Sequence, residues 1–311
     1  MMNLDLSVSL AGVNLEHPIM NAGGTCKRLE GEEGVEGFLK TMVSAVVIGS
    51  ITVEPRDGNS GNVYSYQDPF SLNSLGMPNP GLKYWQEHLP EAVRRCNEAG
   101  KALVMNVAGF NASDYVDLTE MALGGGADIV EENLGCPNVV AGNVQKPVIS
   151  FDFDLVEEIM LRVTERVGAD ARVAFKVSPF SDPSALKRMA AICNRYAIVK
   201  ALVTTNTFPN GFAFGESLKP IITPNNGFGG VGGPAMFGIG LGQVVQFRAA
   251  LDDRIQVVGV GGISTGKNVR DYLLAKAAAV QVATACIERK GRVFNVLLDE
   301  LIAVSSVPRT N

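Results

Sequence analysis

The regular alternation of short apolar runs with longer helical patterns is the feature that most constrains how this chain can fold. Each run is almost entirely apolar, which is the composition of a parallel strand buried on both faces. Eight such runs predict an α/β protein with a single (β/α)8 TIM barrel domain over residues 1–311. A doubly wound sheet is the alternative, but it usually has fewer strands and a GxGxxG turn after the first one. The expected strands are 18–22, 44–51, 102–107, 129–133, 173–177, 201–205, 256–260 and 280–284, and the expected helices include 81–96, 114–122, 153–167, 182–196, 242–251 and 267–277.

Two segments are additions to this barrel. Residues 4–10 alternate between apolar and polar side chains, which predicts a short N-terminal β-hairpin that caps the bottom of the barrel. Residues 54–80 are rich in Gly, Asn, Ser and Pro and lack a helical period. A loop of that length in a compact domain is usually functional, and this one follows the second strand, on the side where barrel enzymes keep their active sites.

Composition excludes several classes of function. Charged residues make up 19% of the chain and its net charge is −5, which argues against nucleic-acid binding. The N-terminus lacks the basic start and apolar block of a signal peptide, and no apolar run is long enough to span a bilayer, so we expect a cytoplasmic protein. Five scattered cysteines without a CxxC pair, and only two histidines, argue against a metal site and a Ser-His-Asp triad.

A cysteine at the exit of the fourth predicted strand is the best candidate for chemistry. Cys136 lies between Asn133 and Asn138 and directly before a proline. Its thiol is placed to take up a proton, while the two amides hold a polar, planar substrate. A free thiol has a pKa of about 8.5, so a base at neutral pH needs tuning, and Glu131 and Glu132 would raise this pKa if they pointed towards it.

Two glycine-rich turns predict a phosphate site. Residues 259–266 follow the seventh strand and open a helix, and the eighth strand ends at residues 283–285. Glycines let backbone N–H groups approach a phosphate closely, and barrel enzymes commonly bind phosphate at these two loops. Tight turns without a ligand are the alternative.

Lys176 is a lone cation inside an apolar predicted strand, and an unpaired buried ammonium group is costly. One interpretation is a buried salt bridge with Glu131 or Glu132. The interpretation that we favour is a contact with an electron-rich cofactor such as a reduced flavin. Asparagines at several strand exits and in the long loop would supply donors and acceptors for a planar substrate or a flavin ring. They are Asn21, Asn73, Asn106, Asn133, Asn138 and Asn206.

Four motifs together resemble the dihydroorotate dehydrogenases over essentially the whole chain. They are Asn-Leu-Gly-Cys-Pro-Asn at 133–138, Asn-Ser-Leu-Gly-Met-Pro-Asn at 73–79, Asn-Gly-Phe-Gly-Gly at 226–230 and Gly-Val-Gly-Gly at 259–262. The cysteine and the lack of an N-terminal membrane extension are similar to the class 1A enzymes, which are cytosolic homodimers that use FMN. The resemblance implies oxidation of dihydroorotate to orotate in pyrimidine biosynthesis, with a soluble acceptor such as fumarate.

The resemblance also implies roles for individual residues. Cys136 would be the catalytic base. The substrate would be lined by Asn73, Leu75, Gly76, Met77, Asn133, Asn138, Asn206 and Thr207. FMN would be held by Ala22, Gly24, Gly49, Ser50, Asn106, Asn133, Lys176, Gly230, Gly261, Gly262, Ala283 and Thr284.

Position 49 departs from the family pattern. The family has an active-site lysine at the end of the second strand, where this chain has Gly49, and Val63 stands where a second basic residue is expected. Arg56 is retained. Loss of the lysine supports an alternative in which an FMN-dependent paralogue acts on the C=C bond of a less anionic substrate. A non-catalytic flavin-binding barrel is a second alternative.

Overall fold

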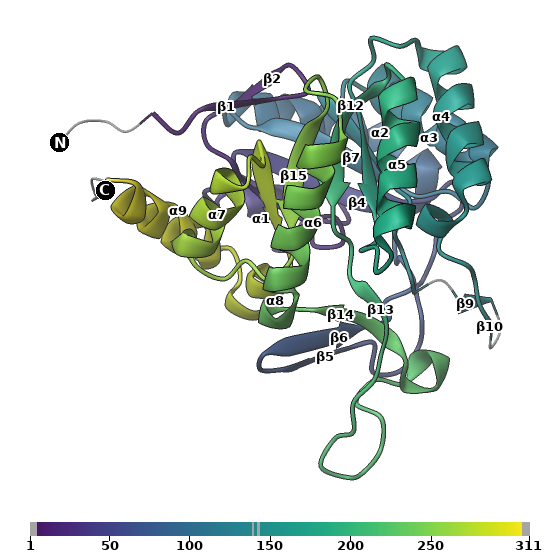
Figure 1. The fold of residues 1–311 in the computed structure, drawn as a ribbon, viewed down its shortest axis with the longest axis vertical. Coiled ribbons are helices and arrows are strands. Elements are labelled where there is room, and N and C mark those ends of the chain that lie inside the picture. Colours follow the sequence, from purple (N-terminus) through teal and green to yellow (C-terminus); the bar gives the residue numbers. More distant parts are fainter. Residues whose placement is uncertain (1–4, 139, 142–143, 307–311) are drawn as a thin grey trace.

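Eight parallel strands form the centre of the computed structural model, which describes residues 5–138, 140–141 and 144–306 (Figure 1). They follow one another in the order β3, β16, β15, β12, β11, β8, β7 and β4. Their bounds are Ile19–Asn21 (β3), Ala45–Ile51 (β4), Ala102–Val107 (β7), Ile129–Asn133 (β8), Val173–Val177 (β11), Val199–Thr204 (β12), Gln256–Val260 (β15) and Ala279–Val282 (β16). The predicted (β/α)8 barrel is therefore confirmed, and four of the eight predicted strands have the observed bounds.

The barrel closes between β3 and β4 through a few polar contacts. The backbone N–H of Ser44 donates to the carbonyl oxygen of Ile19 across 3.0 Å. The Asn21 side chain then bonds both backbone groups of Val47, each at 2.8 Å. The Asn21 side chain thus makes the hydrogen bonds that would otherwise join β3 and β4 as paired strands. Asn21, one of the asparagines noted at strand ends, has a structural role here.

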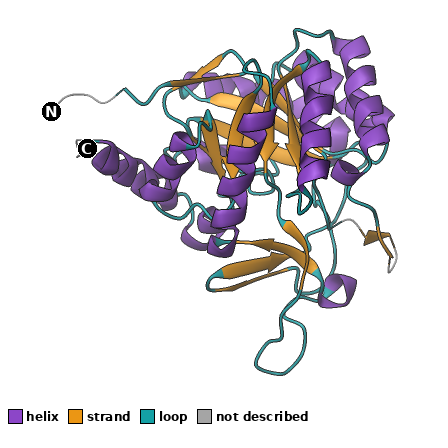
Figure 2. Cartoon of the chain, in the orientation of Figure 1, coloured by secondary structure: helices purple, strands orange, loops and turns teal. Residues whose placement is uncertain are grey.

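Helices surround the strands, as Figure 2 shows. Their bounds are Val35–Leu39 (α1), Gly81–Glu98 (α2), Ala112–Gly124 (α3), Phe153–Val167 (α4), Pro183–Arg195 (α5), Phe237–Ala250 (α6), Gly266–Leu274 (α7), Thr284–Arg289 (α8) and Arg292–Ser305 (α9). Side chains cap several of them: Asn111 accepts from the backbone of Asp114, and Thr265 and Asn268 form a capping box. In the part of the chain that the structure describes, no helix is long and apolar enough to cross a membrane.

Helix α6 begins five residues before the predicted start at residue 242. Glycines at 238, 240 and 242 hide the helical pattern in the sequence. Gly240 is required by packing, because a Cβ there would lie 2.6 Å from the carbonyl oxygen of Val260. A short 3-10 turn, Pro234–Met236, leads directly into the helix.

The inside of the barrel has an apolar lower part and a polar upper part. Small and branched side chains fill the lower part, including those of Val47, Val104, Ala174 and Val258. The N-terminal hairpin, β1 (Val8–Leu10) and β2 (Val13–Leu15), packs its leucines against this cluster. The predicted cap at the bottom of the barrel is thereby confirmed.

A second, four-stranded antiparallel sheet lies beside the other end of the barrel, below it in Figure 1. Its strands are Tyr64–Gln67 (β5), Phe70–Asn73 (β6), Phe208–Gly211 (β13) and Gly229–Gly232 (β14). The segment 54–80, read from the sequence as a loop, therefore contains a hairpin. The strands are short and partly polar, and β6 is completed by pairing with the distant β14, so the local sequence carried little signal for them. Near the site, β9 (Val140–Ala141) and β10 (Val144–Gln145) form a small hairpin, and two further 3-10 turns are Ile149–Phe151 and Pro224–Gly227.

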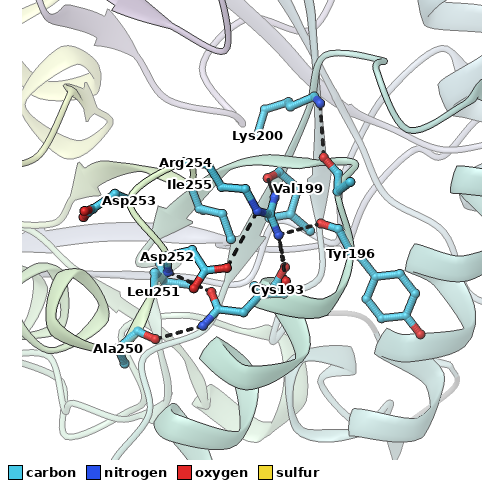
Figure 3. Close-up of polar contacts among 12 residues, drawn as sticks. Cys193, Tyr196, Val199, Lys200, Ala250, Leu251, Asp252, Asp253, Arg254 and Ile255 are labelled. Carbon is cyan, nitrogen blue, oxygen red and sulfur yellow. Dashed lines mark hydrogen bonds and ion pairs between the residues drawn. The ribbon is translucent and has the colours of Figure 1, made fainter.

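Arg254 joins the end of α5 to the start of β12 at the bottom of the barrel, as Figure 3 shows. Its guanidinium group donates to the carbonyl oxygens of Cys193, Asn194 and Tyr196 at the end of α5, at 2.8–3.3 Å. It also donates to Val199 at the start of β12 across 3.2 Å. A cation is favourable at a helix C-terminus, so Arg254 stabilises this end of the barrel. Barrel enzymes carry their active sites at the opposite end.

Candidate active site

Two adjoining cavities lie where the barrel strands end and the second sheet begins. The central cavity contains Cys136 and is lined by Gly23, Gly24, Thr25, Lys27, Gly49, Ser50, Tyr64, Ser71, Asn73, Leu75, Gly76, Met77, Pro78, Asn133, Asn138, Asn206, Thr207, Ala283, Thr284 and Ile287. The adjoining pocket shares four of these residues and continues along the loops after β15 and β16. The two are therefore parts of one site at the C-terminal end of the barrel, the end that carries the active sites of barrel enzymes.

The turn that carries Cys136, after β8, is held by residues that follow β11 and β12. The carbonyl oxygen of Gly135 accepts from the Asn206 amide at 2.7 Å and from the Ser178 hydroxyl at 3.1 Å. The Asn133 side chain accepts from the backbone N–H of Gly135 at 3.0 Å. Residue 135 must be glycine, because a Cβ would lie 2.7 Å from the backbone nitrogen of Ser178. Cys136 is thus presented to the cavity by a rigid turn.

Opposing effects act on the pKa of the Cys136 thiol. Burial is the largest and raises its pKa. The backbone N–H of Asn138, which donates to the sulfur, and the positive charges of Arg56 and Lys176 act in the opposite direction. The nearby carboxylates do not point towards the thiol: Glu131 turns into the barrel. Cys136 is therefore a weakly acidic group whose thiolate is supported by two cations.

The neighbouring Glu132 turns out of the barrel instead. It accepts from the Thr119 hydroxyl on α3 at 2.9 Å, and its second carboxyl oxygen is buried without a hydrogen-bond partner. Burial raises the pKa of Glu132 to about 8. Burial therefore favours the protonated form of this carboxyl group in the folded protein.

The predicted amides lie together and orient one another. Asn138 donates to the side-chain oxygen of Asn73 at 2.8 Å, and Asn73 donates to the carbonyl oxygen of Gly230 at 3.1 Å. Asn133 donates to the hydroxyl of Ser50 at 2.9 Å. These contacts join β8, β6 and β14, so the second sheet fixes the polar edge of the cavity next to Cys136.

A polar layer crosses the barrel interior beneath the cavity. Lys176 lies 3.7 Å from Glu131 and donates to Gln281 at 3.1 Å. Asn106 and Gln281 in turn donate to the two oxygens of Glu131. Of the two interpretations of Lys176, the salt bridge with Glu131 is present. The side-chain oxygen of Asn106 is buried without a hydrogen-bond partner, so this layer keeps one open acceptor.

The structure brings most of the predicted site residues together. Fifteen of them line one or both cavities, in addition to Cys136: Gly24, Gly49, Ser50, Asn73, Leu75, Gly76, Met77, Asn133, Asn138, Asn206, Thr207, Gly261, Gly262, Ala283 and Thr284. Asn106 and Lys176 belong to the polar layer below, and Gly230 packs against Thr207. Ala22 is buried at the end of β3, where its N–H bonds Val282.

Sequence reasoning missed several residues that the structure adds to this region, including Lys27, Tyr64 and Arg289. Lys27 and Tyr64 line the central cavity, and Arg289 lines the adjoining pocket. Lys27 lies a few residues after the first strand of the barrel. A basic residue soon after a strand exit could have indicated a place in the active site. Tyr64 and Arg289 carry no comparable signal in the local sequence.

Comparison with known proteins agrees with this arrangement. The model of the dihydroorotate dehydrogenase family matches residues 5–304. The chain belongs to the dihydroorotate dehydrogenase family. A relative in Kluyveromyces lactis, dihydroorotate dehydrogenase (fumarate), is 30% identical over 305 residues, which cover 97% of this chain and 94% of the relative. Probable dihydroorotate dehydrogenase A (fumarate) of Enterococcus faecalis is 31% identical over 310 residues, with 96% and 93% covered.

Solved structures of dihydroorotate dehydrogenase support the fold. The Eimeria tenella enzyme in complex with ferulenol superposes with a TM-score of 0.81 at 21% identity, over 96% of this chain and 84% of that one. Its ligand-free form gives a TM-score of 0.78 at 22% identity, over 96% and 87% of the two chains. At this identity the likeness establishes the barrel architecture alone.

Dihydroorotate dehydrogenases are flavin-dependent oxidoreductases that act on CH–CH bonds. Two observations test whether these residues fit a flavin. The buried Asn106 oxygen and the buried Thr205 hydroxyl, which lie at the ends of β7 and β12, have no hydrogen-bond partner in the described structure. A ring with donors and acceptors on its edge would satisfy such groups. The free acceptor of Asn106 and the free hydroxyl of Thr205 therefore fit a flavin of this family.

Proposed function

We propose that this protein oxidises dihydroorotate to orotate with bound FMN, and that a soluble acceptor such as fumarate receives the electrons. The observation that carries the proposal is the position of Cys136, which faces a cavity bordered by amides. Fumarate enters the proposal because relatives that the chain resembles over most of its length are named dihydroorotate dehydrogenase (fumarate).

The amide-rich edge of the cavity is the proposed substrate site. Dihydroorotate is a cyclic imide that offers N–H donors and carbonyl acceptors, and asparagine side chains complement both. The proposed substrate residues are Asn73, Leu75, Gly76, Met77, Asn133, Asn138, Asn206 and Thr207. Because several of these amides already bond one another or the backbone, their orientation is set before substrate enters, which reduces the ordering cost of binding.

The polar layer and the adjoining pocket are the proposed FMN site. Gly261, Gly262, Ala283 and Thr284 line that pocket and would hold the phosphate group. Asn106 and Lys176 would contact the ring, with Ala22, Gly24, Gly49, Ser50, Asn133 and Gly230 packed around it. Lys176 is already close to Glu131, so its charge is partly balanced when the ring is oxidised.

The chemistry assigned to the protein is removal of one proton. The Cys136 thiolate takes a proton from the carbon adjacent to the carboxyl-bearing carbon of dihydroorotate. Bound FMN would supply the acceptor for the hydride that leaves the carboxyl-bearing carbon as the C=C bond forms. Two cations, Arg56 and Lys176, support the thiolate that begins the reaction. The turn bonded to Asn206 and Ser178 keeps the sulfur in position.

Anaerobic flavin reduction tests the proposal directly. Dihydroorotate mixed with the purified holoprotein should bleach the flavin absorbance within seconds, and fumarate should restore it. Cys136→Ala should retain the flavin but slow the bleaching by at least about 100-fold, the usual contribution of a general base. Bleaching by dihydrouracil and not by dihydroorotate would instead support the paralogue with a less anionic substrate. A flavin that neither compound reduces would support the non-catalytic barrel.

Assembly and location belong to the same proposal. The class 1A resemblance supports a homodimer that works in the cytoplasm without a metal ion. Sedimentation of the purified protein at micromolar concentration should give the mass of two chains of 33.0 kDa each.

A further inference from the structure

The central cavity has one charged side chain among the described residues that line it. That side chain is Lys27, on the loop between β3 and α1. All other lining residues are glycines, amides, hydroxyl-bearing or apolar residues and the Cys136 thiol. An anionic substrate in this cavity therefore meets a single direct source of positive charge.

The two other cations near the thiol are already engaged. Lys176 lies below the cavity, next to Glu131. Arg56 donates to the carbonyl oxygen of Gly76 at 3.0 Å, and its guanidinium group lies over the ring of Phe110. Lys27 differs from both, because its ammonium group makes no hydrogen bond or ion pair with any residue that the structure describes. The negative charge of Glu33 acts on the pKa of Lys27, but Glu33 forms its ion pair with Lys290, at 3.9 Å.

Residue 49 cannot supply a cation to this cavity. A Cβ at Gly49 would lie 2.1 Å from the carbonyl oxygen of Asn106, and the φ angle of +114° is one that side-chain-bearing residues rarely adopt. The loop that carries Lys27 is bonded to the backbone of residue 49. Gly49 donates its N–H to Cys26 at 2.8 Å and accepts from the N–H of Gly24. These bonds fix the loop on β4 next to Lys27, and Lys27 and Gly49 both line the central cavity.

We propose that Lys27 is the residue that binds the carboxylate of the substrate and so determines the preference of this site for an anionic dihydropyrimidine. The inference rests on the proposed function. An ammonium–carboxylate contact in a partly enclosed cavity is a charge-assisted hydrogen bond, which is about twice as strong as a neutral one. Burial also lowers the pKa of Lys27, and an anionic ligand would reverse that effect.

Binding of orotate and of uracil to the oxidised holoprotein tests the assignment, because the two ligands differ in the carboxylate. Orotate binding is followed through the shift of the flavin spectrum. Lys27→Gln should weaken orotate binding roughly 10- to 100-fold and raise KM for dihydroorotate more than it lowers kcat, with uracil binding unchanged. Lys27→Arg should recover much of the lost affinity because it keeps the charge.

Lys40→Gln is the matched control. Lys40 lies in a neighbouring cleft, pairs with Glu36 at 3.2 Å and is 72% exposed, so its loss should leave orotate binding unchanged. Equal orotate affinity in wild type and Lys27→Gln, or an equal loss for orotate and uracil, would overturn the role of Lys27 alone. A wild-type holoprotein that neither binds orotate nor is reduced by dihydroorotate would overturn the proposed function as well. Flavin content and melting temperature of each variant confirm that it has folded.

Discussion

Gly49 and Cys26 are joined by a backbone hydrogen bond of 2.8 Å, from the N–H of the glycine to the carbonyl oxygen of the cysteine. The bond connects the end of β4 to the loop that follows β3, and it crosses the seam where the barrel closes. It also holds Lys27 next to a position that has no side chain. The charge of the cavity is therefore set by a loop that packs on residue 49.

Gly49→Ala should destabilise the protein strongly. The new Cβ would meet the carbonyl oxygen of Asn106, a backbone atom of β7 that cannot move away without distorting the barrel. We expect a loss of at least about 3 kcal/mol in the free energy of unfolding, together with loss of flavin. Denaturant unfolding followed by far-UV circular dichroism measures the change. Gly12→Ala is the control: its φ is +80° but its surroundings are open, so it should cost only about 1 kcal/mol.

The rate of flavin reduction by dihydroorotate should rise with pH. Because burial raises the pKa of Cys136, the thiolate is a minor species at neutral pH, and its fraction grows about tenfold per pH unit below the pKa. Stopped-flow measurements between pH 6 and 10 should show this rise, with a plateau only above the usual thiol pKa of about 8.5. A rate that is constant from pH 6 to 9 would argue against the thiolate as base.

Arg56→Gln should move the same profile to higher pH, because it removes a positive charge that lowers the pKa of Cys136. Arg56 also bonds the carbonyl oxygen of Gly76, and Arg56→Lys separates the two effects. The lysine variant keeps the charge, so its profile should stay near that of the wild type even if the maximal rate falls. Identical shifts in both variants would assign the effect to the lost bond instead.

Glu132→Gln should stabilise the protein increasingly as pH rises from about 4.5 to 8. Burial raises the pKa of Glu132 to about 8 in the folded protein, whereas the unfolded chain releases this proton near pH 4.3. The folded state thus binds more protons in that window, so wild-type stability falls with pH there. The glutamine stays neutral and can still accept from Thr119. Urea midpoints at pH 5, 6, 7 and 8 should diverge, and parallel midpoints would contradict a buried neutral carboxyl group.

Lys176→Met should cost about 3–5 kcal/mol of unfolding free energy, because it leaves the buried Glu131 charge without its cation. Adding Glu131→Gln should recover part of this loss, since the double variant buries no unpaired charge. Denaturant unfolding of the two single variants and the double variant gives the coupling energy between the residues. Strictly additive losses would mean that the 3.7 Å contact contributes nothing to stability.

The barrel was predictable from the sequence because its strands are buried on both faces. Runs such as the one from Ala102 to Val107 have to be continuously apolar, and β7 was predicted with its observed bounds. The second sheet was not predictable, because β6 takes its stability from β14 and from the contact between Asn73 and Gly230. Pairing between segments this far apart leaves no periodic trace in either of them.

The site was predictable to the extent that it is built from strand exits. Asn133 ends a predicted strand, Cys136 and Asn206 each lie just after one, and parallel strands end at one face of a barrel. Lys27 and Gln281 could not be assigned in the same way. The first depends on how a loop folds back on Gly49, and the second on which barrel residues meet across the interior.

The second sheet pairs its strands with one another, and no described strand is shared between it and the barrel. It is joined to the barrel by side-chain contacts such as Asn138 to Asn73 and Ser71 to Thr284. Breaking these contacts leaves every ladder hydrogen bond of both sheets intact. We therefore expect the second sheet to open as a unit at a lower free energy than global unfolding, so that ligands exchange without loosening of the barrel.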